Sequence, residues 1–467
     1  MMPFQFVFLW TDLLIYLLLV VIGFYAWRAA GTEHLAAPWR KLARRPGAMS
    51  AAVILVAFVV VGLMDSVHFR LPLPDQKPGE PRQYAPEVLS LLDHVVGSLK
   101  DNKEKTYSAP FATQLYAKEN IEQPDGHIVR AFPRLKYGGA HLGEALDRRG
   151  ADILQRGASG TLLALLGWAV AIALVASRLG RAGSEKFSDT LKQLARGQTE
   201  LPWRAMLITF GFILWGVLLA WAWAPVYHIF GTDKVGQDVF YLSLKSIRTG
   251  LVIGTLTTLV MLPFALALGV MAGYFRGWVD DVIQYLYTTL NSIPGVLLIA
   301  AAVLVLQVHM DRLPDLTLLE RADLRLLFLC MILGITSWTG LCRLLRAETL
   351  KLREMDYIQA AQAFGVRPVR IMARHVLPNV MHIVLITITL EFSGLVLAEA
   401  VLAYVGVGVD PSMQSWGNMI NGARLELARD PVVWWLLAAA FVFMFVLVLA
   451  ANLFSDAVRD AFDPRMQ

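Results

Sequence analysis

The stretch VVWWLLAAAFVFMFVLVLAANLF, residues 432–454, contains no charged side chain. A helix needs about 20 predominantly apolar residues to cross the hydrocarbon core of a bilayer, and this stretch is long enough. Eight further apolar windows occur along the chain, at residues 5–27, 49–65, 158–178, 205–225, 249–274, 288–308, 325–345 and 380–405. The sequence therefore predicts an all-α polytopic membrane helix bundle with about nine transmembrane helices.

The composition agrees with a membrane protein, because 56% of the residues are hydrophobic and only 17% are charged. The formal net charge is +5, and no basic segment interleaved with aromatic residues is present, so we expect no nucleic-acid partner. The two cysteines, Cys330 and Cys342, share one apolar window. Helix geometry separates them by about 18 Å, which excludes a disulfide within that helix.

Lysine and arginine gather in three segments between the windows, residues 29–48, 179–204 and 343–378. With nine spans these segments all fall on one side of the membrane, and the positive-inside rule makes that side cytoplasmic. The N-terminus is then periplasmic and the C-terminus cytoplasmic. The first apolar window is longer than the core of a signal peptide and has no positive leader, so we expect it to remain as a span.

One sizeable region, residues 66–157, lies outside the apolar windows on the extracytoplasmic side. It is rich in proline at first, and its apolar spacing predicts a helix over residues 86–100. Its length supports a small lobe with a thin core that packs on its neighbours. We therefore divide the chain into two N-terminal spans, this lobe, a pair of spans and a membrane domain with a basic loop at 343–378; the bounds are 1–65, 66–157, 158–225 and 226–467.

The sequence carries no catalytic signature. It lacks the phosphate-binding pattern G-x-x-x-x-G-K-[ST], and it lacks H-E-x-x-H, C-x-x-C and G-x-S-x-G. Its nine histidines have no ligand spacing, so we predict no metal site. We expect a chain that is not an enzyme and holds no cofactor of its own.

Two acidic residues, Glu391 and Glu399, fall within the apolar window 380–405. Carboxylates are costly when they face lipid, so we expect both to face protein or water. Their spacing places them about 80° apart around a helix. Two interpretations remain open: bonding between helices, or a polar lining of a substrate path.

Loop 343–378 has the pattern of two short helices joined at a glycine. Tyr357, Ala360 or Ala361, and Phe364 form an apolar stripe, and Gly365 suits the left-handed end of a helix. Pro368 fits the first turn of a second helix, which we expect Pro378 to terminate. The residues alone leave two alternatives: the loop sits in a groove of a partner protein, or it rests on lipid headgroups.

The loop resembles the EAA loop of binding-protein-dependent ABC importer permeases. That pattern is Glu-Ala-Ala, three residues, Gly, nine residues, Ile, one residue and Leu-Pro. This chain keeps every interval, with Gln359 in place of the acid and His375 in place of the isoleucine. The peptide-permease branch often has His-x-Leu-Pro-Asn here, which matches residues 375–379.

Further segments resemble the second (C-type) permease subunit of dipeptide and oligopeptide importers. They are Gly231–Asp238, Ala272–Asp280, Ser415–Met419 and Arg459–Pro464, and they follow the order of that family. Residues 39–65 are similar to the usual start of the family. The resemblance implies a type I ABC importer permease core with three extra N-terminal spans, at 5–27, 158–178 and 205–225.

The resemblance also implies partners and a site. It implies a multi-pass protein of the bacterial inner membrane, surrounded by lipid, that translocates di- or oligopeptides with a second homologous permease subunit. Two cytoplasmic ABC ATPase subunits would bind ATP and Mg, and an extracytoplasmic binding protein would deliver the ligand. The expected ATPase-docking residues are Tyr357, Gln359, Ala360, Ala361, Phe364, Gly365 and Arg367, and the expected path residues are Glu391 and Glu399.

Alternatives remain open for the function. Nickel chelates, opines or peptide-like antibiotics could be the cargo of the same importer class. A stand-alone channel or secondary transporter is the alternative from another class, although no pair of Gly/Pro-broken spans in corresponding positions supports it. For the lobe at 66–157, we expect contact with the binding protein.

Overall fold

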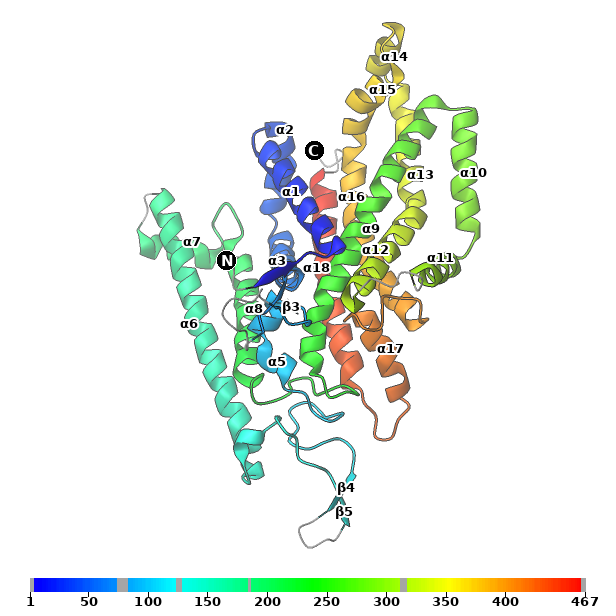
Figure 1. The fold of residues 1–467 in the computed structure, drawn as a ribbon. Helices are drawn as coiled ribbons and strands as arrows, with labels where there is room; N and C mark the ends of the chain where they lie inside the picture. Colours follow the sequence, from blue (N-terminus) through cyan, green and yellow to red (C-terminus); the bar gives the residue numbers. More distant parts are fainter. Residues whose placement is uncertain (1–3, 74–82, 123–127, 184–185, 311–316, 463–467) are drawn as a thin grey trace. The chain divides into compact units, whose positions relative to one another are not determined.

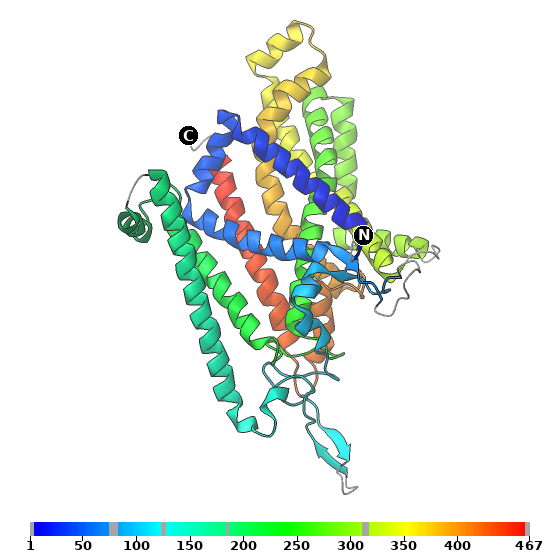
Figure 2. The same cartoon turned by 60° about the vertical axis from the view of Figure 1, so that its left-hand side comes forward.

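A computed structural model of the chain describes residues 4–73, 83–122, 128–183, 186–310 and 317–462. Helices dominate it, which confirms the predicted all-α membrane bundle (Figures 1 and 2). In these ranges, eight helical segments are long and apolar enough to span a membrane: Trp10–Arg28, Pro46–Ser66, Leu146–Arg181, Trp203–Trp223, Val239–Phe275, Leu318–Arg353, Pro368–Tyr404 and Trp435–Phe462.

The predicted window at 288–308 does not form one continuous helix. The chain forms α10 (Trp278–Ser292) and α11 (Gly295–Met310), and the two helices are bent by 87° at the break between them. Pro294 explains the break, since a proline disfavours the helical conformation of the residue before it. Ile293 accordingly has extended dihedral angles, φ −93° and ψ 130°. The count reaches nine only if this bent pair is one span.

The chain divides into two compact units. The first comprises Met1–Val7, Arg40–Thr249 and Gln414–Ala450, and the second comprises Phe8–Trp39, Gly250–Met413 and Ala451–Gln467. The long helices α9 (Val239–Phe275) and α18 (Trp435–Phe462) continue from one unit into the other, as does α2 (Glu33–Ala43).

The membrane part of the first unit is built around the pair α6 (Arg149–Gly183) and α8 (Trp203–Trp223), joined by α7 (Phe187–Arg196). α3 (Pro46–Ser66) packs on α8. Small residues allow the α6–α8 pair to approach closely: a Cβ added at Gly160 would lie 3.1 Å from the carbonyl oxygen of Leu218. Such contacts are typical of helix pairs in membranes, where close packing drives association.

All but one of the short strands described lie in the lobe, and the other one comes before the first span. β1 (Gln5–Val7), β2 (His68–Arg70) and β3 (Leu89–Ser90) form an antiparallel sheet in that order, and β4 (Glu119–Glu122) pairs with β5 (Ile128–Ala131) as a hairpin. Helical pieces are α4 (Leu91–Val95), α5 (Gly97–Asp101), η1 (Ala140–Leu142) and η2 (Leu146–Arg148).

The helix predicted over 86–100 is therefore wrong at its start. Residues 89–90 pair with β2, and Ser90 caps α4 in a reciprocal box with Asp93, so the helix begins only at Leu91. A break at Val96 separates α4 from α5.

A buried acid–histidine–acid group joins the lobe to the start of α9. His228 Nδ1 lies 2.7 Å from Asp238 Oδ2, and its Nε2 lies 3.4 Å from Glu104 Oε1. Glu104 also accepts hydrogen bonds from three backbone N–H groups at residues 136–138, at 2.8, 2.8 and 3.1 Å. All three side chains are at most 4% exposed.

Hydrogen bonding outweighs burial in setting the charges of this group. Burial alone would lower the pKa of His228, but Asp238 and Glu104 raise that pKa from 6.5 to about 9. Burial alone would raise the pKa of Glu104, but His228 and the three N–H donors lower it from 4.5 to about 2. A positive ring thus lies between carboxylates.

This group should make the stability of the chain pH-dependent. The contribution of His228 is complete below pH 6.5 and is lost as the pH rises through about 9, because its folded pKa is raised. The contribution of Glu104 is complete above pH 4.5 and is lost as the pH falls through about 2. We expect His228→Gln to lower the unfolding free energy by about 3–5 kcal/mol, since it leaves two buried carboxylates without their cation.

The measurement is thermal unfolding of the purified chain in detergent, followed by tryptophan fluorescence between pH 5 and pH 9. The unfolding temperature of wild type should fall as the pH rises above 6.5. The unfolding temperature of His228→Gln should not show this fall. His94→Gln is the control, because His94 is exposed on α4. Equal pH profiles for wild type and His228→Gln would contradict the assignment.

The second unit holds the remaining helices. These are α1 (Trp10–Ala30), α10, α11, α12 (Leu318–Ser337), α13 (Thr339–Arg353), α14 (Asp356–Ala363), α15 (Pro368–Ile371), the π-helical turn η3 (Met372–Val376) and α16 (Leu377–Tyr404). α17 (Trp416–Glu426) belongs to the first unit. α1 packs on α12, and the backbone N–H of Thr11 donates to Asp323 at 3.2 Å.

Candidate functional site

Loop 343–378 is an ordered helical projection in the second unit. α13 leads out of the bundle, α14 and α15 form the tip, and η3 and α16 lead back (Figure 1). The basic side chains of Arg367, Arg370 and Arg374 are exposed at this end. The tip is therefore a cationic surface with apolar side chains on it.

Gly365 ends α14 as the sequence predicts. Its φ is +73°, a conformation in which a side chain would be strained. The N–H of Gly365 donates to the carbonyl of Gln362 at 2.9 Å, and the N–H of Val366 donates to that of Ala361 at 3.1 Å. These two bonds form a Schellman motif, which turns the chain sharply at the tip.

The expectation that Pro378 terminates the second helix is wrong. Residues 368–404 continue as one helical segment, in which the π-helical turn η3 connects α15 to α16. Pro378 lies in the first turn of α16, and the helical segment continues through it although a proline has no N–H to donate to the preceding turn. The wider π turn accommodates the chain before this proline.

The tip has a buried side and an exposed side. Ile358 and Ile371 are fully buried in a cluster with Leu345 and other residues of α9, α10 and α13. Phe364 is 87% exposed, and Tyr357 is 45% exposed. The predicted apolar stripe thus lies on the outward face of the tip. Ile358 packs on the inward face and holds the tip against the other helices.

The other predicted docking residues divide between these two sides. Gln359, Ala360, Gly365 and Arg367 are exposed, whereas Ala361 is half-buried and packs against the cluster of Ile358. Gln359 donates to the carbonyl of Glu354 at 3.2 Å. One side of the tip therefore packs against the bundle, and the other side is exposed.

Segment 272–280 forms the support under the tip. Tyr274 is buried, and its hydroxyl accepts a hydrogen bond from Gln362 at 3.3 Å. Asp280 accepts two hydrogen bonds from Arg346, both at 2.6 Å, in the bidentate geometry that orients both partners. Arg276 donates to Glu354 at the end of α13.

Two glycines bring α9 and α13 into close contact above this support. A Cβ added at Gly273 would lie 2.6 Å from Thr349 Cβ and 2.7 Å from the carbonyl oxygen of Arg346. At Gly269 it would lie 2.8 Å from Leu345 Cβ. Sequence reasoning missed this pair, although its G-x-x-x-G spacing is a known signal of close helix packing in membranes.

Glu391 and Glu399 both lie on α16, and the structure does not bring them together. Glu399 is buried, at 3% exposure, and Glu391 is half-buried. Eight residues separate them by about 12 Å along the helix axis. Around them, Ser393 donates to Asn452 at 2.6 Å and Ser455 donates to Thr389 at 2.9 Å, so polar pairs join α16 to α18.

The fold and the loop define a class, a polytopic α-helical membrane protein with an exposed helical tip. Residues 265–467 match the family described as the binding-protein-dependent transport system inner membrane component. Three curated relatives are each 31% identical to this chain and align with 51% of it.

The first relative is the glutathione transport system permease protein GsiD of Pectobacterium atrosepticum, of which 73% is covered. The second is the dipeptide transport system permease protein DppC of Alkalihalophilus pseudofirmus, also covered over 73%. The third is the oligopeptide transport system permease protein OppC of Mycobacterium bovis, covered over 76%.

The chain belongs to the binding-protein-dependent family of inner membrane transport components. It is a permease subunit of an ABC importer, multi-pass in the inner membrane, and such subunits work with ATPase and substrate-binding partners. The predicted resemblance of its C-terminal half is confirmed.

The close packing of α9 on α13 can be tested by a substitution at Gly273. Gly273→Ala forces a Cβ into backbone and side-chain atoms of α13, so we expect it to lower the unfolding free energy by about 1–3 kcal/mol. Gly340→Ala in α13 is the matched control, because a Cβ there meets nothing within 4 Å. Thermal unfolding in detergent measures both, and equal stability of the two variants would contradict the close contact.

Proposed function

We propose that this chain carries peptides across the inner membrane as the permease subunit of an ATP-driven importer, and that the tip of loop 343–378 receives the ATPase. The observation that carries the proposal is the exposed Phe364 on a tip whose other side is fixed by buried Ile358. The names of the relatives, which concern glutathione, dipeptides and oligopeptides, support the cargo class.

The exposed residues have distinct roles in this docking. Phe364 inserts into a groove of the ATPase as an aromatic anchor, which is the residue type that dominates interface energies. Tyr357 and the small Ala360 allow close approach beside it, while Gln359 and Arg367 make polar contacts at the rim. Ala361 and Gly365 act indirectly, because they hold the tip in shape.

Force then passes from the tip to the spans. The tip is held by the Tyr274–Gln362 hydrogen bond and the bidentate Asp280–Arg346 pair, so it moves together with α9, α10 and α13. ATP-driven closure of the docked ATPases rocks these helices as a body between inward-open and outward-open states. The chain itself supplies no catalytic group.

The complete transporter contains a second homologous permease subunit, two cytoplasmic ATPase subunits that bind ATP and Mg, and an extracytoplasmic binding protein. With the bent pair α10–α11 counted as one span, the N-terminus is periplasmic and the C-terminus cytoplasmic, in keeping with the basic segments at 29–48, 179–204 and 343–378. Half-buried Glu391 lines the substrate path, and buried Glu399 supports the helix beside it.

Removal of the aromatic anchor tests the proposed docking. We expect Phe364→Ala to lower the amount of ATPase that co-purifies with the tagged full chain by about 30-fold, the factor for loss of an interface residue worth about 2 kcal/mol. Quantitative mass spectrometry of complexes from the native membrane measures the ratio of ATPase to chain. Ala360→Arg, which changes only an exposed position, should act in the same direction.

Leu425→Ala is the control, because Leu425 is 72% exposed but lies on α17 in the first unit. An unchanged ATPase ratio in Phe364→Ala would refute the docking site. Uptake assays in vesicles test the transport function separately: peptide uptake should require ATP and the ATPase subunits. Peptide uptake by the purified chain alone, without ATP, would refute the importer.

The β4–β5 hairpin is the part of the lobe that suits contact with the binding protein. Ile128 is 69% exposed, Val129 41% and Phe132 42%, so the hairpin presents apolar side chains. The rest of the lobe is bound to the unit through Glu104 and through Thr232, whose hydroxyl donates to the carbonyl of Thr106 at 2.8 Å. A deletion of the whole lobe would therefore damage the fold, and the hairpin is the sharper target.

We expect Ile128→Ser combined with Phe132→Ser to raise the concentration of binding protein needed for half-maximal uptake by about tenfold, through lost apolar burial. ATPase co-purification should stay unchanged. Val95→Ser in the same lobe is the control, since Val95 is 48% exposed on α4. If the double variant has a normal requirement for binding protein, the hairpin is not the contact.

A further inference from the structure

A groove lies between the membrane helices of the first unit, near the end of α6 and the start of α8. Its volume is about 610 Å³, within the usual range of about 300–1,000 Å³ for ligand sites. Apolar side chains from three helices line most of it, including Val53 of α3, Leu174 of α6 and Phe210 of α8. The lining thus suits a hydrocarbon chain.

Two polar donors stand at the end of the groove that faces α7. Arg178 is exposed and Trp203 is half-buried, and both line the groove. Among the described residues, neither the guanidinium of Arg178 nor the indole N–H of Trp203 has an acceptor. By contrast, the indole N–H groups of Trp168, Trp215 and Trp223 in the same helix pair donate to Leu207, Thr161 and Ile153 at 2.7, 3.1 and 3.1 Å.

The helices around these donors expose the kind of apolar surface that faces lipid. Only 11% of the apolar window in α6 and 6% of that in α8 is buried within the chain. α7 packs on the ends of both helices, and it exposes Phe187 and Leu191 at 49% and 38%. Apolar side chains exposed on a short amphipathic helix are typical of a helix that lies in the headgroup region.

The local charge is positive. Residues 178–204 contain six basic and three acidic side chains, an excess of three positive charges. Basic residues at this depth attract anionic phospholipids of the inner leaflet. A ligand with an apolar chain and a phosphate would complement both the lining and the end of the groove.

We propose that this groove binds one anionic phospholipid, with an acyl chain between α3, α6 and α8 and the phosphate held by Arg178 and Trp203. Arg178 supplies the cation, and Trp203 donates its indole N–H to a phosphate or ester oxygen, the position that amphipathic aromatic rings take at membrane surfaces. The lipid would fasten the helix pair α6–α8 to the leaflet that carries the basic segments.

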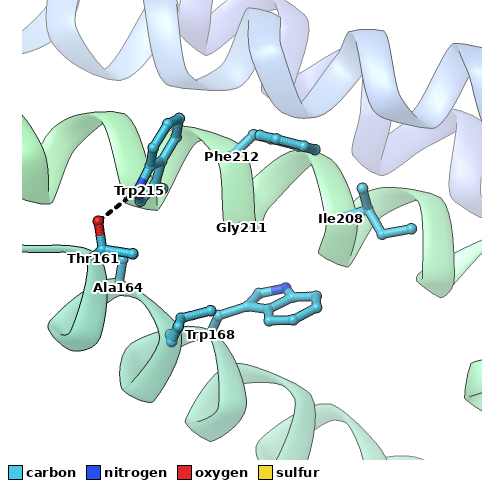
Figure 3. Close-up of a pocket in the computed structure, with 8 residues that line it drawn as sticks. Thr161, Ala164, Trp168, Ile208, Gly211, Phe212 and Trp215 are labelled. Carbon is cyan, nitrogen blue, oxygen red and sulfur yellow. Dashed lines mark hydrogen bonds between the residues drawn. The ribbon is translucent and has the colours of Figure 1, made fainter. Parts of the chain in front are cut away.

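A second cavity on the same helix pair is apolar like the groove, but its indole N–H groups already have acceptors. It has a volume of about 440 Å³ and is lined by residues such as Ala164, Trp168 and Phe212 (Figure 3). Among the residues that the structure describes, no charged side chain lines it, and the indole of Trp215 is already bonded to Thr161 (Figure 3). If apolar lining alone determined lipid binding, both cavities would bind lipid equally. Recognition of the headgroup by polar donors favours the first cavity.

The test uses the full chain reconstituted in phosphatidylcholine vesicles that contain a trace of photoactivatable phosphatidylglycerol. After illumination, mass spectrometry locates and quantifies the labelled peptides. We expect labelling within residues 171–179 and 203–210. Arg178→Gln should lower it about fivefold, the factor for losing one arginine at an anionic lipid surface, and Trp203→Phe should lower it in the same direction while keeping the aromatic ring.

Arg181→Gln is the matched control, because Arg181 is exposed one turn further along α6 and does not line the groove. Its labelling should equal that of wild type, and unfolding temperatures of all variants should agree. Photoactivatable phosphatidylcholine should label the groove several-fold less. Equal labelling by the two lipids, equal labelling of Arg178→Gln and wild type, or labelling confined to the second cavity would overturn the proposal.

Discussion

The close crossing of α9 and α13 at Gly269 and Gly273 is the contact on which the rest of the second unit depends. Because these residues have no side chain, the two helix backbones meet closely. Tyr274 then touches the tip, and Asp280 reaches Arg346. In the proposed docking, motion at the loop reaches the spans through this connection.

Burial on one side of the tip explains why its other side can stay exposed. Helix α14 has only eight residues and would not be stable alone in water. Ile358 stabilises it by full burial, worth about 1.5–3 kcal/mol. The exposed Phe364 is therefore presented by a preformed helix, and binding of a partner need not order the loop.

Much of this architecture could be predicted from the sequence. The long apolar windows predict spans because a bilayer allows few other structures, and Gly365 predicts a helix end because its backbone conformation excludes most residues. The motif spacing from Gln359 to Pro378 indicates the family. Four of the predicted docking residues are exposed on the tip together with Tyr357 and Phe364.

Other features depend on contacts between distant residues, which periodicity does not reveal. The inward role of Ile358, the Asp280–Arg346 pair and the group around His228 join segments that lie far apart in the sequence. The break at Pro294 and the continuation through Pro378 show a further limit. A proline interrupts the helix at the first site, whereas at the second the helical segment runs through the proline by way of a π-helical turn.

The π-helical turn η3 has a consequence for the direction in which Phe364 points. A π turn holds one more residue than an α turn, so it offsets the helix before it from the helix after it by about 100° of rotation. The five residues from Met372 to Val376 therefore set the angular phase between the tip and α16. The length of this short segment decides which way the tip faces.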